Sequence, residues 1–230
     1  MSDDNFEKPK QEINEQTGLP ILTDEFKEKA GSKASLAAVI MPVIGTAIGT
    51  GLSYLVYRFG DKDKYDSRIV AAKEFEVQWM LLGLIVFTLT VGWLNMYPMR
   101  FKEKFMGGGA AGNLRANMFI YKMATDTDGE GSAIVLNTEG DIGAYNRGNR
   151  SLHHFLENSL PLVASLPLSF FLFPLPTFVL VCTFCLGRIG HQIGYANAGY
   201  GGHGLGFLMA TISSNMVLGL MIIAYYKMVV

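Results

Sequence analysis

Long apolar stretches alternate with polar segments along the chain and predict five membrane-spanning helices. A helix needs about 20 predominantly apolar residues to cross a bilayer, and the matching ranges are Ala34–Tyr57, Val77–Tyr97, Leu152–Phe173, Thr177–Asn197 and Leu205–Met228. The apolar stretch from 156 to 187 is too long for one crossing, and Pro174 and Pro176 interrupt it. We therefore predict an all-α polytopic membrane protein in which the third and fourth spans form a tight hairpin.

The same pattern divides the chain into three parts. Residues 1–33 form a polar tail, residues 34–76 hold the first span and its following loop, and residues 77–230 form a membrane domain of four spans. The polar, glycine-rich segment 98–151 is expected to be a long exposed loop. Its glycine run at 106–113 lacks the ending of a phosphate-binding loop, and its acids at 126–132 lack the closing glutamate of an EF-hand. Neither a nucleotide site nor a metal site is predicted there.

The distribution of lysine and arginine predicts the orientation of the spans. If the spans alternate, the tail, the loop 98–151 and the loop 198–204 share one side of the membrane, and this side carries most of the basic residues outside the spans. By the positive-inside rule this side faces the cytosol or the mitochondrial matrix. The start of the chain shows no signal-peptide pattern, so the first span is expected to act as an internal start-transfer helix. The pattern leaves open the endoplasmic reticulum or another organelle membrane, the mitochondrial one included.

Composition narrows the classes of function. Half of the residues are hydrophobic (50%), only 17% are charged, and the net charge is −1. The basic residues are scattered among acids and form no patch, which argues against nucleic acid as a partner. Cys182 and Cys185 have CxxC spacing but lie inside an apolar run without a second ligand pair, so they are interpreted as inert thiols in a helix.

A stripe of polar side chains marks the entrance of the third span. At 100° per residue, its members fall within one arc of about 100°; they are Arg147, Arg150, His154, Glu157 and Asn158. The fourth span carries a second stripe at i, i+3, i+4 and i+7, formed by Arg188, His191, Gln192 and Tyr195. Ionisable groups near the membrane normally face a bundle interior or a wet cavity. A hairpin of these two helices would bring both stripes together in one pocket that opens toward the cytosolic side.

Two interpretations of these stripes remain open. Arginines pair bidentately with carboxylates and a glutamate can bind an amine, so the stripes fit a small zwitterionic ligand with several carboxylates. Alternatively, Arg147, Arg150 and Glu157 neutralise one another between subunits as a structural ion network. In the first span, Gly45 and Gly49 have GxxxG spacing, which can bring a neighbouring helix close.

Two motifs resemble one known family. The segment RSLHHFLENSLP at 150–161 resembles the second-helix signature R-x-x-x-N-x-x-E-N-x-x-P of microsomal glutathione transferases, with matches at Arg150, Glu157, Asn158 and Pro161. The preceding Tyr145 and Asn146 are similar to the pair that opens this motif in some members. The later segment CLGRIGHQIGYANAGYG is similar to the third-helix exit of the family, through Arg188, His191 and Tyr195. The chain thus resembles the MAPEG superfamily, the membrane-associated proteins in eicosanoid and glutathione metabolism, over about Val77–Met228.

This resemblance implies a four-helix membrane bundle that assembles as a homotrimer and binds glutathione as co-substrate between subunits. It implies that the first span and its tail are an addition to the family fold. The glutathione-binding residues it implies are Asn146, Arg150, His154, Glu157, Asn158, Arg188, His191 and Tyr195. Tyr195 and His203 are the expected catalytic residues.

Two departures from the family pattern bear on catalysis. The motif asparagine is His154 here, and the arginine that many members place about seven residues after the tyrosine is replaced by Gly202 beside His203. A fixed positive charge normally stabilises the thiolate, and His203 supplies one only when it is protonated. The pattern therefore supports glutathione binding more directly than catalysis.

Two functions follow as hypotheses. The first is a membrane glutathione transferase or peroxidase whose lipophilic electrophile or lipid hydroperoxide arrives from the bilayer. The second is a catalytically silent MAPEG-like subunit of a larger membrane complex, with the first span, the tail and the loop 98–151 as surfaces for other membrane subunits.

Overall fold

Five long helices dominate the computed structural model, which describes residues 12–15, 19–107, 118–125 and 131–230. The long helices are α1 (Asp24–Phe59), α3 (Val77–Met96), α6 (Gly140–Leu172), α7 (Pro174–Ala198) and α8 (Gly204–Val229). Two shorter helices lie between them, α2 (Lys62–Lys73) and α4 (Met99–Met106). Within the described residues, five segments are long and apolar enough to cross a membrane, with α3 and α4 counting as one. The prediction of a mostly helical, polytopic membrane protein is confirmed at this level.

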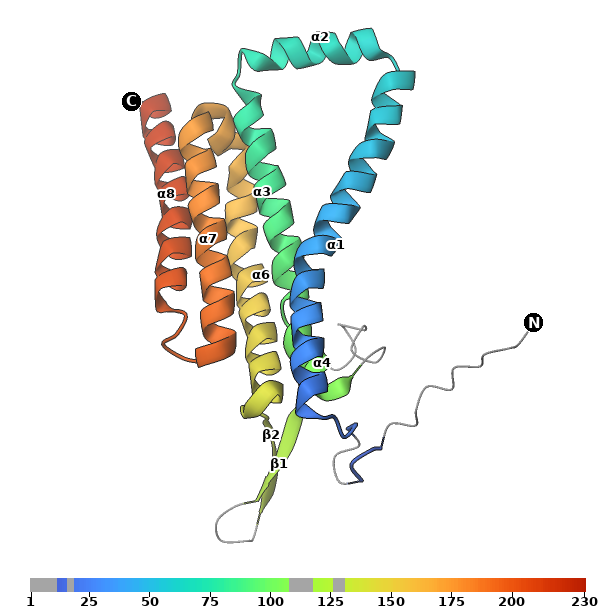
Figure 1. The fold of residues 1–230 in the computed structure, drawn as a ribbon. Helices are drawn as coiled ribbons and strands as arrows, with labels where there is room; N and C mark the ends of the chain where they lie inside the picture. Colours follow the sequence, from blue (N-terminus) through green and yellow to red (C-terminus); the bar gives the residue numbers. More distant parts are fainter. Residues whose placement is uncertain (1–11, 16–18, 108–117, 126–130) are drawn as a thin grey trace, which may run out of the picture.

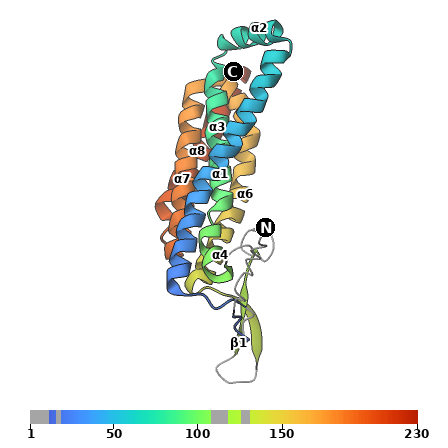
Figure 2. The same ribbon diagram turned by 45° about the vertical axis from the view of Figure 1, so that its right-hand side comes forward.

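The bundle consists of α3, α6, α7 and α8, with α1 along its side (Figures 1 and 2). The start of α6 and the α7–α8 connection lie at the same end as the start of α1, and α2 and the C-terminus lie at the other end (Figure 1). The core between these helices is apolar and aromatic, and it includes Leu94, Phe155, Leu166, Phe170, Val181, Phe184 and Val217. The bundle thereby holds the polar residues of α6 and α7 at one end.

The predicted hairpin between the third and fourth spans is present. Phe173 is the only residue between α6 and α7, and it caps both helices. The hydroxyl of Thr177 lies 2.7 Å from that of Ser169 and 3.1 Å from the Ser169 carbonyl oxygen, so the buried turn closes with its own hydrogen bonds. This turn fixes the register in which the two polar stripes face each other.

Two helices begin earlier than the apolar pattern predicted. α1 begins at Asp24 rather than at 34, and α6 begins at Gly140 rather than at Leu152. The added turns are polar in sequence, but small residues such as Ala30 and Gly148 bury them against other helices. The length of the apolar stretch therefore underestimates the length of both helices. The first helix begins inside the segment 1–33 that was assigned to the polar tail.

The segment 98–151 is not a simple exposed loop. It contains α4, an antiparallel hairpin of β1 (Tyr121–Thr125) and β2 (Ser132–Leu136), and the first turns of α6. α4 buries Phe101 and Phe105 in a second small core with Tyr97 and Tyr145. The glycine run beyond Gly107 and most of the acidic segment that follows β1 lie outside the described residues.

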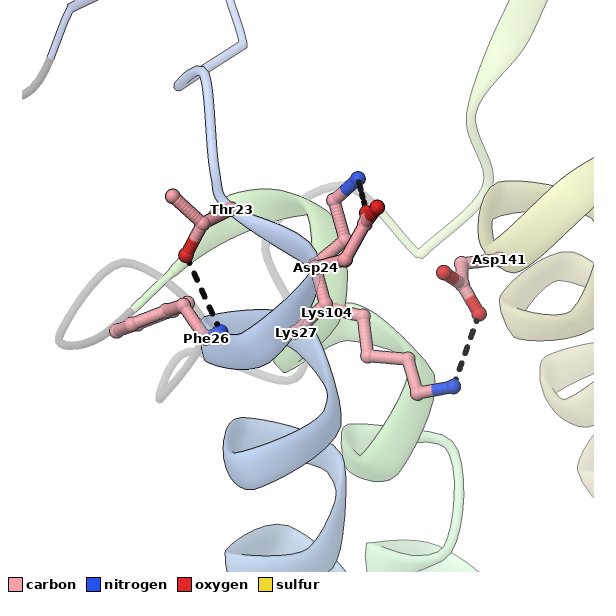
Figure 3. A network of polar contacts seen from close by, with 6 residues as sticks. All are labelled: Thr23, Asp24, Phe26, Lys27, Lys104 and Asp141. Carbon is pink, nitrogen blue, oxygen red and sulfur yellow. Dashed lines mark hydrogen bonds and ion pairs between the residues drawn. The ribbon is translucent and has the colours of Figure 1, made fainter.

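Polar contacts within the first turn of α1 lie beside an ion pair between α4 and α6 (Figure 3). Thr23 caps α1 by accepting a hydrogen bond from the Phe26 amide at 3.3 Å. Lys104 of α4 pairs with Asp141 of α6 at 3.3 Å. α4 thus connects the base of α1, against which it packs, to the start of α6.

The segment 58–76, expected to be a loop, contains α2, which is attached to α1 by a polar corner. Tyr57 donates a hydrogen bond to Asp66 at 2.5 Å, and Lys62 forms an ion pair with the same carboxylate. The hydrogen bond from Lys62 lowers the pKa of Asp66, and the same bond raises the pKa of Lys62. The corner is therefore present at neutral pH. It weakens as acid protonates Asp66, below the usual carboxylate pKa of about 4, and as base deprotonates Lys62, above its usual pKa.

Glycine allows α7 and α8 to approach closely beside the polar stripes. A Cβ atom on Gly206 would lie 2.3 Å from the backbone nitrogen of His191 and 2.6 Å from the carbonyl oxygen of Gly187. No side chain fits at that separation, so the absence of a Cβ atom lets α8 lie against the backbone of α7. This contact brings the start of α8 next to His191.

We predict that Gly206→Ala destabilises the protein by about 1–3 kcal/mol, because the new methyl group collides with backbone atoms that have no freedom to rotate away. Gly219→Ala is the matched control on the same helix, since no described atom lies within 4 Å of its Cβ position. Thermal unfolding in detergent should show a lower Tm for the first variant and an unchanged or slightly higher Tm for the second. Equal Tm values would contradict the close packing of α7 on α8.

Candidate functional site

The polar stripes of α6 and α7 meet as the sequence predicted. Arg188 donates from Nη2 to the carbonyl oxygen of Ser151 at 3.0 Å and from Nη1 to Nδ1 of His154 at 3.2 Å. One turn away, Nδ1 of His191 lies 2.8 Å from the Ser151 hydroxyl, and Gln192 donates to the carbonyl oxygen of Gly148 at 2.9 Å. The two helices are therefore joined by polar contacts over two turns.

A cavity of about 410 Å³ opens beside these contacts, where α7 passes into α8. Its lining combines cationic, acidic and aromatic side chains from α6, α7, the α7–α8 connection, α8 and the segment before β1: Phe119, Arg150, Ser151, His153, His154, Glu157, His191, Tyr195, Tyr200, His203 and Phe207. Six of the residues predicted for the site, Arg150, His154, Glu157, His191, Tyr195 and His203, lie in this wall. The volume is within the range of small-molecule sites.

Arg188 is the most unusual member of the cluster, because its guanidinium is buried without a counter-charge. The residue is 1% exposed, and its Nε has no hydrogen-bond partner among the residues that the structure describes. Among the described residues no carboxylate lies within ion-pair distance of it, and its nearest further support is the face of Phe155, at 5.5 Å from the ring centroid. A buried charge normally has a paired anion, so the cluster lacks one negative group.

The hydrogen bond from Arg188 fixes the state of His154. An arginine can only donate, so Nδ1 of His154 must accept and carries no proton. His154 is therefore neutral in this arrangement, with its proton on Nε2. Its ring stacks on that of His191 at 5.3 Å, and His191 in turn lies edge-on to His203 at 4.8 Å. Three imidazoles and Tyr195 thus form one contiguous group.

Arg150 and Glu157 line the cavity, but the structure shows no ion pair between them. Both side chains are exposed, and neither takes part in an ion pair with any of the residues that the structure describes. Within one chain the charges of the stripe therefore do not neutralise one another. One cationic and one anionic group remain available at the cavity.

Three predicted site residues, Arg188, Asn158 and Asn146, lie outside the main cavity, as does Arg147 of the polar stripe. Arg188 and Asn158 line a smaller neighbouring cavity of about 90 Å³, which His154 separates from the main one. Arg147 instead donates to backbone oxygens of Ala196 and Thr138. Asn146 is 1% exposed and forms two hydrogen bonds with the backbone of Ile120, directly before β1. Its side chain therefore supports the β1–β2 hairpin and is not placed to contact a ligand.

Sequence reasoning missed several lining residues. Ser151 lies three residues before His154 and Phe207 four residues after His203, so helical phase could have found both. Phe119 and Tyr200 come from connecting segments, where no hydrophobic periodicity marks the lining positions. The aromatic part of the wall was therefore not predicted.

Metal binding and cysteine chemistry were the other candidates that the sequence raised. Within the described ranges, no group of three histidine, cysteine or acidic side chains is arranged to hold a metal ion. Cys182 and Cys185 are free, and Cys185 is buried in the apolar core.

The fold and the cavity define a class of protein, a polytopic helical membrane protein with a polar cavity at one end of its bundle. Comparison with family models found none that matches the chain, and comparisons with curated proteins and with solved structures found no match either. The chemistry of the side chains that line the cavity therefore indicates which ligand it can bind.

We predict that Arg188→Met leaves the Tm of the ligand-free protein unchanged or raises it, because the substitution removes a buried charge whose desolvation opposes folding. Arg147→Met is the matched control and should lower the Tm, since it removes two bonds to backbone oxygens. Differential scanning fluorimetry in detergent without added ligand measures both. A large drop in Tm for Arg188→Met would mean that this arginine serves the fold rather than a ligand.

Proposed function

We propose that the protein binds glutathione in the cavity between α6, α7 and α8 and delivers its thiol to a lipophilic electrophile or lipid hydroperoxide, as a membrane glutathione transferase or peroxidase. The observation that carries this proposal is the buried guanidinium of Arg188, which has no carboxylate partner among the described residues and lies behind His154 at an open cavity. An anionic ligand supplies the missing charge.

The charges around the cavity match those of glutathione. The tripeptide carries two carboxylates and one ammonium group, and the cavity offers Arg150 and Glu157 without intramolecular ion pairs. Arginine binds a carboxylate bidentately, and a glutamate accepts hydrogen bonds from an ammonium group. In this arrangement Arg150 and Arg188 attract the carboxylates, and Glu157 binds the amine. The resemblance of 150–161 to the glutathione-binding signature of the MAPEG superfamily supports the same assignment.

The thiol is assigned to the group formed by Tyr195 and His203, whose ring centroids are 5.1 Å apart. No arginine follows Arg188 in the chain, so another group must stabilise a thiolate here. His203 is the N-cap of α8, where the free amide groups and the positive end of the helix dipole favour an anion. Tyr195 donates a hydrogen bond to the sulfur, and His203 takes the thiol proton. The sulfur then bonds to the electrophilic carbon as the bond from that carbon to the leaving group breaks, and the leaving group departs with the electron pair. With a hydroperoxide, the sulfur bonds to the terminal oxygen as the O–O bond breaks, and the departing alkoxide takes the proton from His203.

The aromatic part of the wall suits the second substrate. Phe119, Tyr200 and Phe207 line the cavity on its apolar side, and aromatic faces provide a large contact area for a lipophilic molecule. The cavity lies between helices long enough to span a membrane, which gives a substrate dissolved in lipid a short route to the sulfur. The proposed setting is the endoplasmic reticulum or another organelle membrane, the mitochondrial one included.

The exposure of Arg150 and Glu157 also supports an assembly. Both side chains lie on a candidate membrane-spanning helix, where ionisable groups avoid contact with lipid. A neighbouring subunit would cover them and complete the site, as in the homotrimer that the family resemblance implies.

A second function is favoured by one observation. Beyond Pro42, α1 has no buried residue although it continues for more than four turns, so it offers a free surface to another membrane protein. In this alternative the chain is a catalytically silent MAPEG-like subunit of a larger complex, and the stripe serves assembly.

The test is calorimetric titration of glutathione into the purified protein. We expect saturable binding that weakens at least about tenfold in Arg150→Ala, because a charge-assisted bond to a carboxylate contributes about 1.5–3 kcal/mol. Arg147→Ala is the matched control, since Arg147 lies one turn away on the same helix, donates hydrogen bonds to backbone oxygens and does not line the cavity. The affinity of this variant should stay near that of the parent protein.

The outcomes separate the two functions. Binding that is lost in Arg150→Ala and kept in Arg147→Ala supports the ligand site, and a screen of electrophiles and hydroperoxides should follow. A folded protein that shows no binding heat with glutathione would contradict the proposal and favour the structural subunit.

A further inference from the structure

A separate cavity of about 160 Å³ lies between α1, the end of α3, the start of α4 and α7. Its lining combines one cationic, two aromatic and three small or aliphatic side chains: Ser35, Ala38, Trp93, Tyr97, Arg100 and Ile193. None of these residues lines the cavity proposed for glutathione or its smaller neighbour. Part of the wall comes from α1, which lies beside the four-helix bundle (Figure 2), so this cavity is a second candidate site.

Arg100 brings a positive charge to this cavity without a counter-charge. Its Nε is buried and has no hydrogen-bond partner among the described residues, none of whose carboxylates lies within ion-pair distance. Nearby, Lys27 and Lys104 have acidic partners at 3.0 and 3.3 Å. The rings of Tyr97 and Phe101 lie 5.7 and 5.4 Å from the guanidinium carbon, and such contacts position a cation without neutralising it. The cavity therefore has room for an anion at Arg100.

The aromatic side chains of the lining add hydrogen-bond donors. Trp93 carries an indole N–H, which can only donate. The hydroxyl oxygen of Tyr97 accepts a hydrogen bond from Nδ2 of Asn197 at 3.1 Å, so its own hydrogen is available to donate. No carboxylate is found in the described lining. Guanidinium, indole and hydroxyl donors without an acidic group suit the oxygens of a phosphate and do not suit a cation.

The cavity lies where two spans change from polar to apolar sequence. Ser35 is the second residue of the first apolar stretch, and Tyr97 is the last residue of the second. Close packing keeps these two ends together, since the Cβ position of Gly31 on α1 lies 3.2 Å from the carbonyl oxygen of Arg100. Tryptophan and tyrosine are enriched at the boundary between membrane and water, as Trp93 and Tyr97 are here. This boundary is the depth at which the phosphate groups of phospholipids lie.

We propose that this cavity binds the phosphate group of an anionic membrane phospholipid at Arg100. The volume is below the range of about 300–1,000 Å³ for small-molecule sites, so the headgroup enters and the acyl chains stay in the bilayer. A free phosphate ion makes no use of the apolar wall that Ala38 and Ile193 provide, whereas the lipid packs its glycerol and chains against it. One uncompensated cation favours a lipid with net negative charge over a zwitterionic one. The proposal does not depend on which ligand fills the main cavity.

Fluorescence quenching tests the site directly, because one of the two tryptophans of the chain lies in its wall. In a Trp79→Phe background, Trp93 is the single tryptophan. The protein is reconstituted in phosphatidylcholine vesicles, and phosphatidylglycerol that is brominated near the carboxyl ends of its acyl chains is added in increasing fraction. We expect half-maximal quenching of Trp93 at a lipid fraction at least about fivefold lower than with brominated phosphatidylcholine, because the charge-assisted bonds to Arg100 favour the anionic lipid.

Three variants assign this preference to Arg100. Arg100→Gln should abolish the preference for phosphatidylglycerol, and Arg100→Lys should retain part of it because the charge remains. Lys33→Gln is the matched control, since it also removes a positive charge near the start of α1 but lines a different cavity; its preference should match that of the parent protein. Circular dichroism checks that each variant is folded.

Equal quenching by the two lipids in the parent protein would overturn the proposal, and this comparison holds even if Arg100→Gln does not fold. A preference that survives Arg100→Gln, or one that Lys33→Gln loses to the same extent, would also overturn it and indicate a general effect of surface charge. Inorganic phosphate added at constant ionic strength should leave the quenching unchanged. Recovery of the fluorescence would assign the site to a free anion instead. Because no glutathione is present, failure here leaves the assignment of the main cavity untouched.

Discussion

The structure around the cavity depends on one constraint, the burial of a guanidinium in a helical bundle without a counter-charge from any described residue. Arg188 is held by a backbone carbonyl oxygen and by Nδ1 of His154, which satisfy hydrogen bonds but provide no negative charge. The bond to His154 has a second effect, since it forces that imidazole into the neutral form with its proton on Nε2. His154 then stacks on His191, which is oriented in turn by the Ser151 hydroxyl. One uncompensated charge thus sets the protonation and orientation of the side chains between it and the cavity.

The scaffold that holds this charge is built mainly from close backbone contacts. Gly206 brings α8 against α7, and the short turn at Phe173 fixes α6 against α7. Asn146 connects the first turns of α6 to the segment that leads into β1. Together these contacts bring α6, α7, α8 and the segment before β1 to the wall of one cavity of about 410 Å³. The polar residues lie at the end of the bundle, and the apolar core beneath them is continuous.

The sequence predicted those features that depend on local periodicity. Five spans were visible as apolar stretches, the hairpin followed from Pro174 and Pro176, and helical phase placed Arg150, His154 and Glu157 opposite Arg188 and His191. The early start of α6 was missed because its first residues are polar and are buried by bonds to backbone atoms far along the chain, such as Asn146 with Ile120. α2 and the β-hairpin were missed because neither is marked by a strong apolar pattern. Among the described residues, neither Arg150 nor Glu157 lies within ion-pair distance of an oppositely charged group. Their spacing in the sequence does not reveal this, because it depends on how the folded side chains are placed.

The most direct test of the account is a cryo-electron microscopy map of the protein in lipid nanodiscs with glutathione added. We expect density for the tripeptide in the cavity between α6, α7 and α8, with one carboxylate at Arg150 and the amine at Glu157. We expect its second carboxylate beside His154, on the side of the cavity nearest Arg188. A well-resolved map with an empty cavity, in which Arg188 pairs with a carboxylate of a neighbouring subunit, would contradict it and make the arginine part of the assembly.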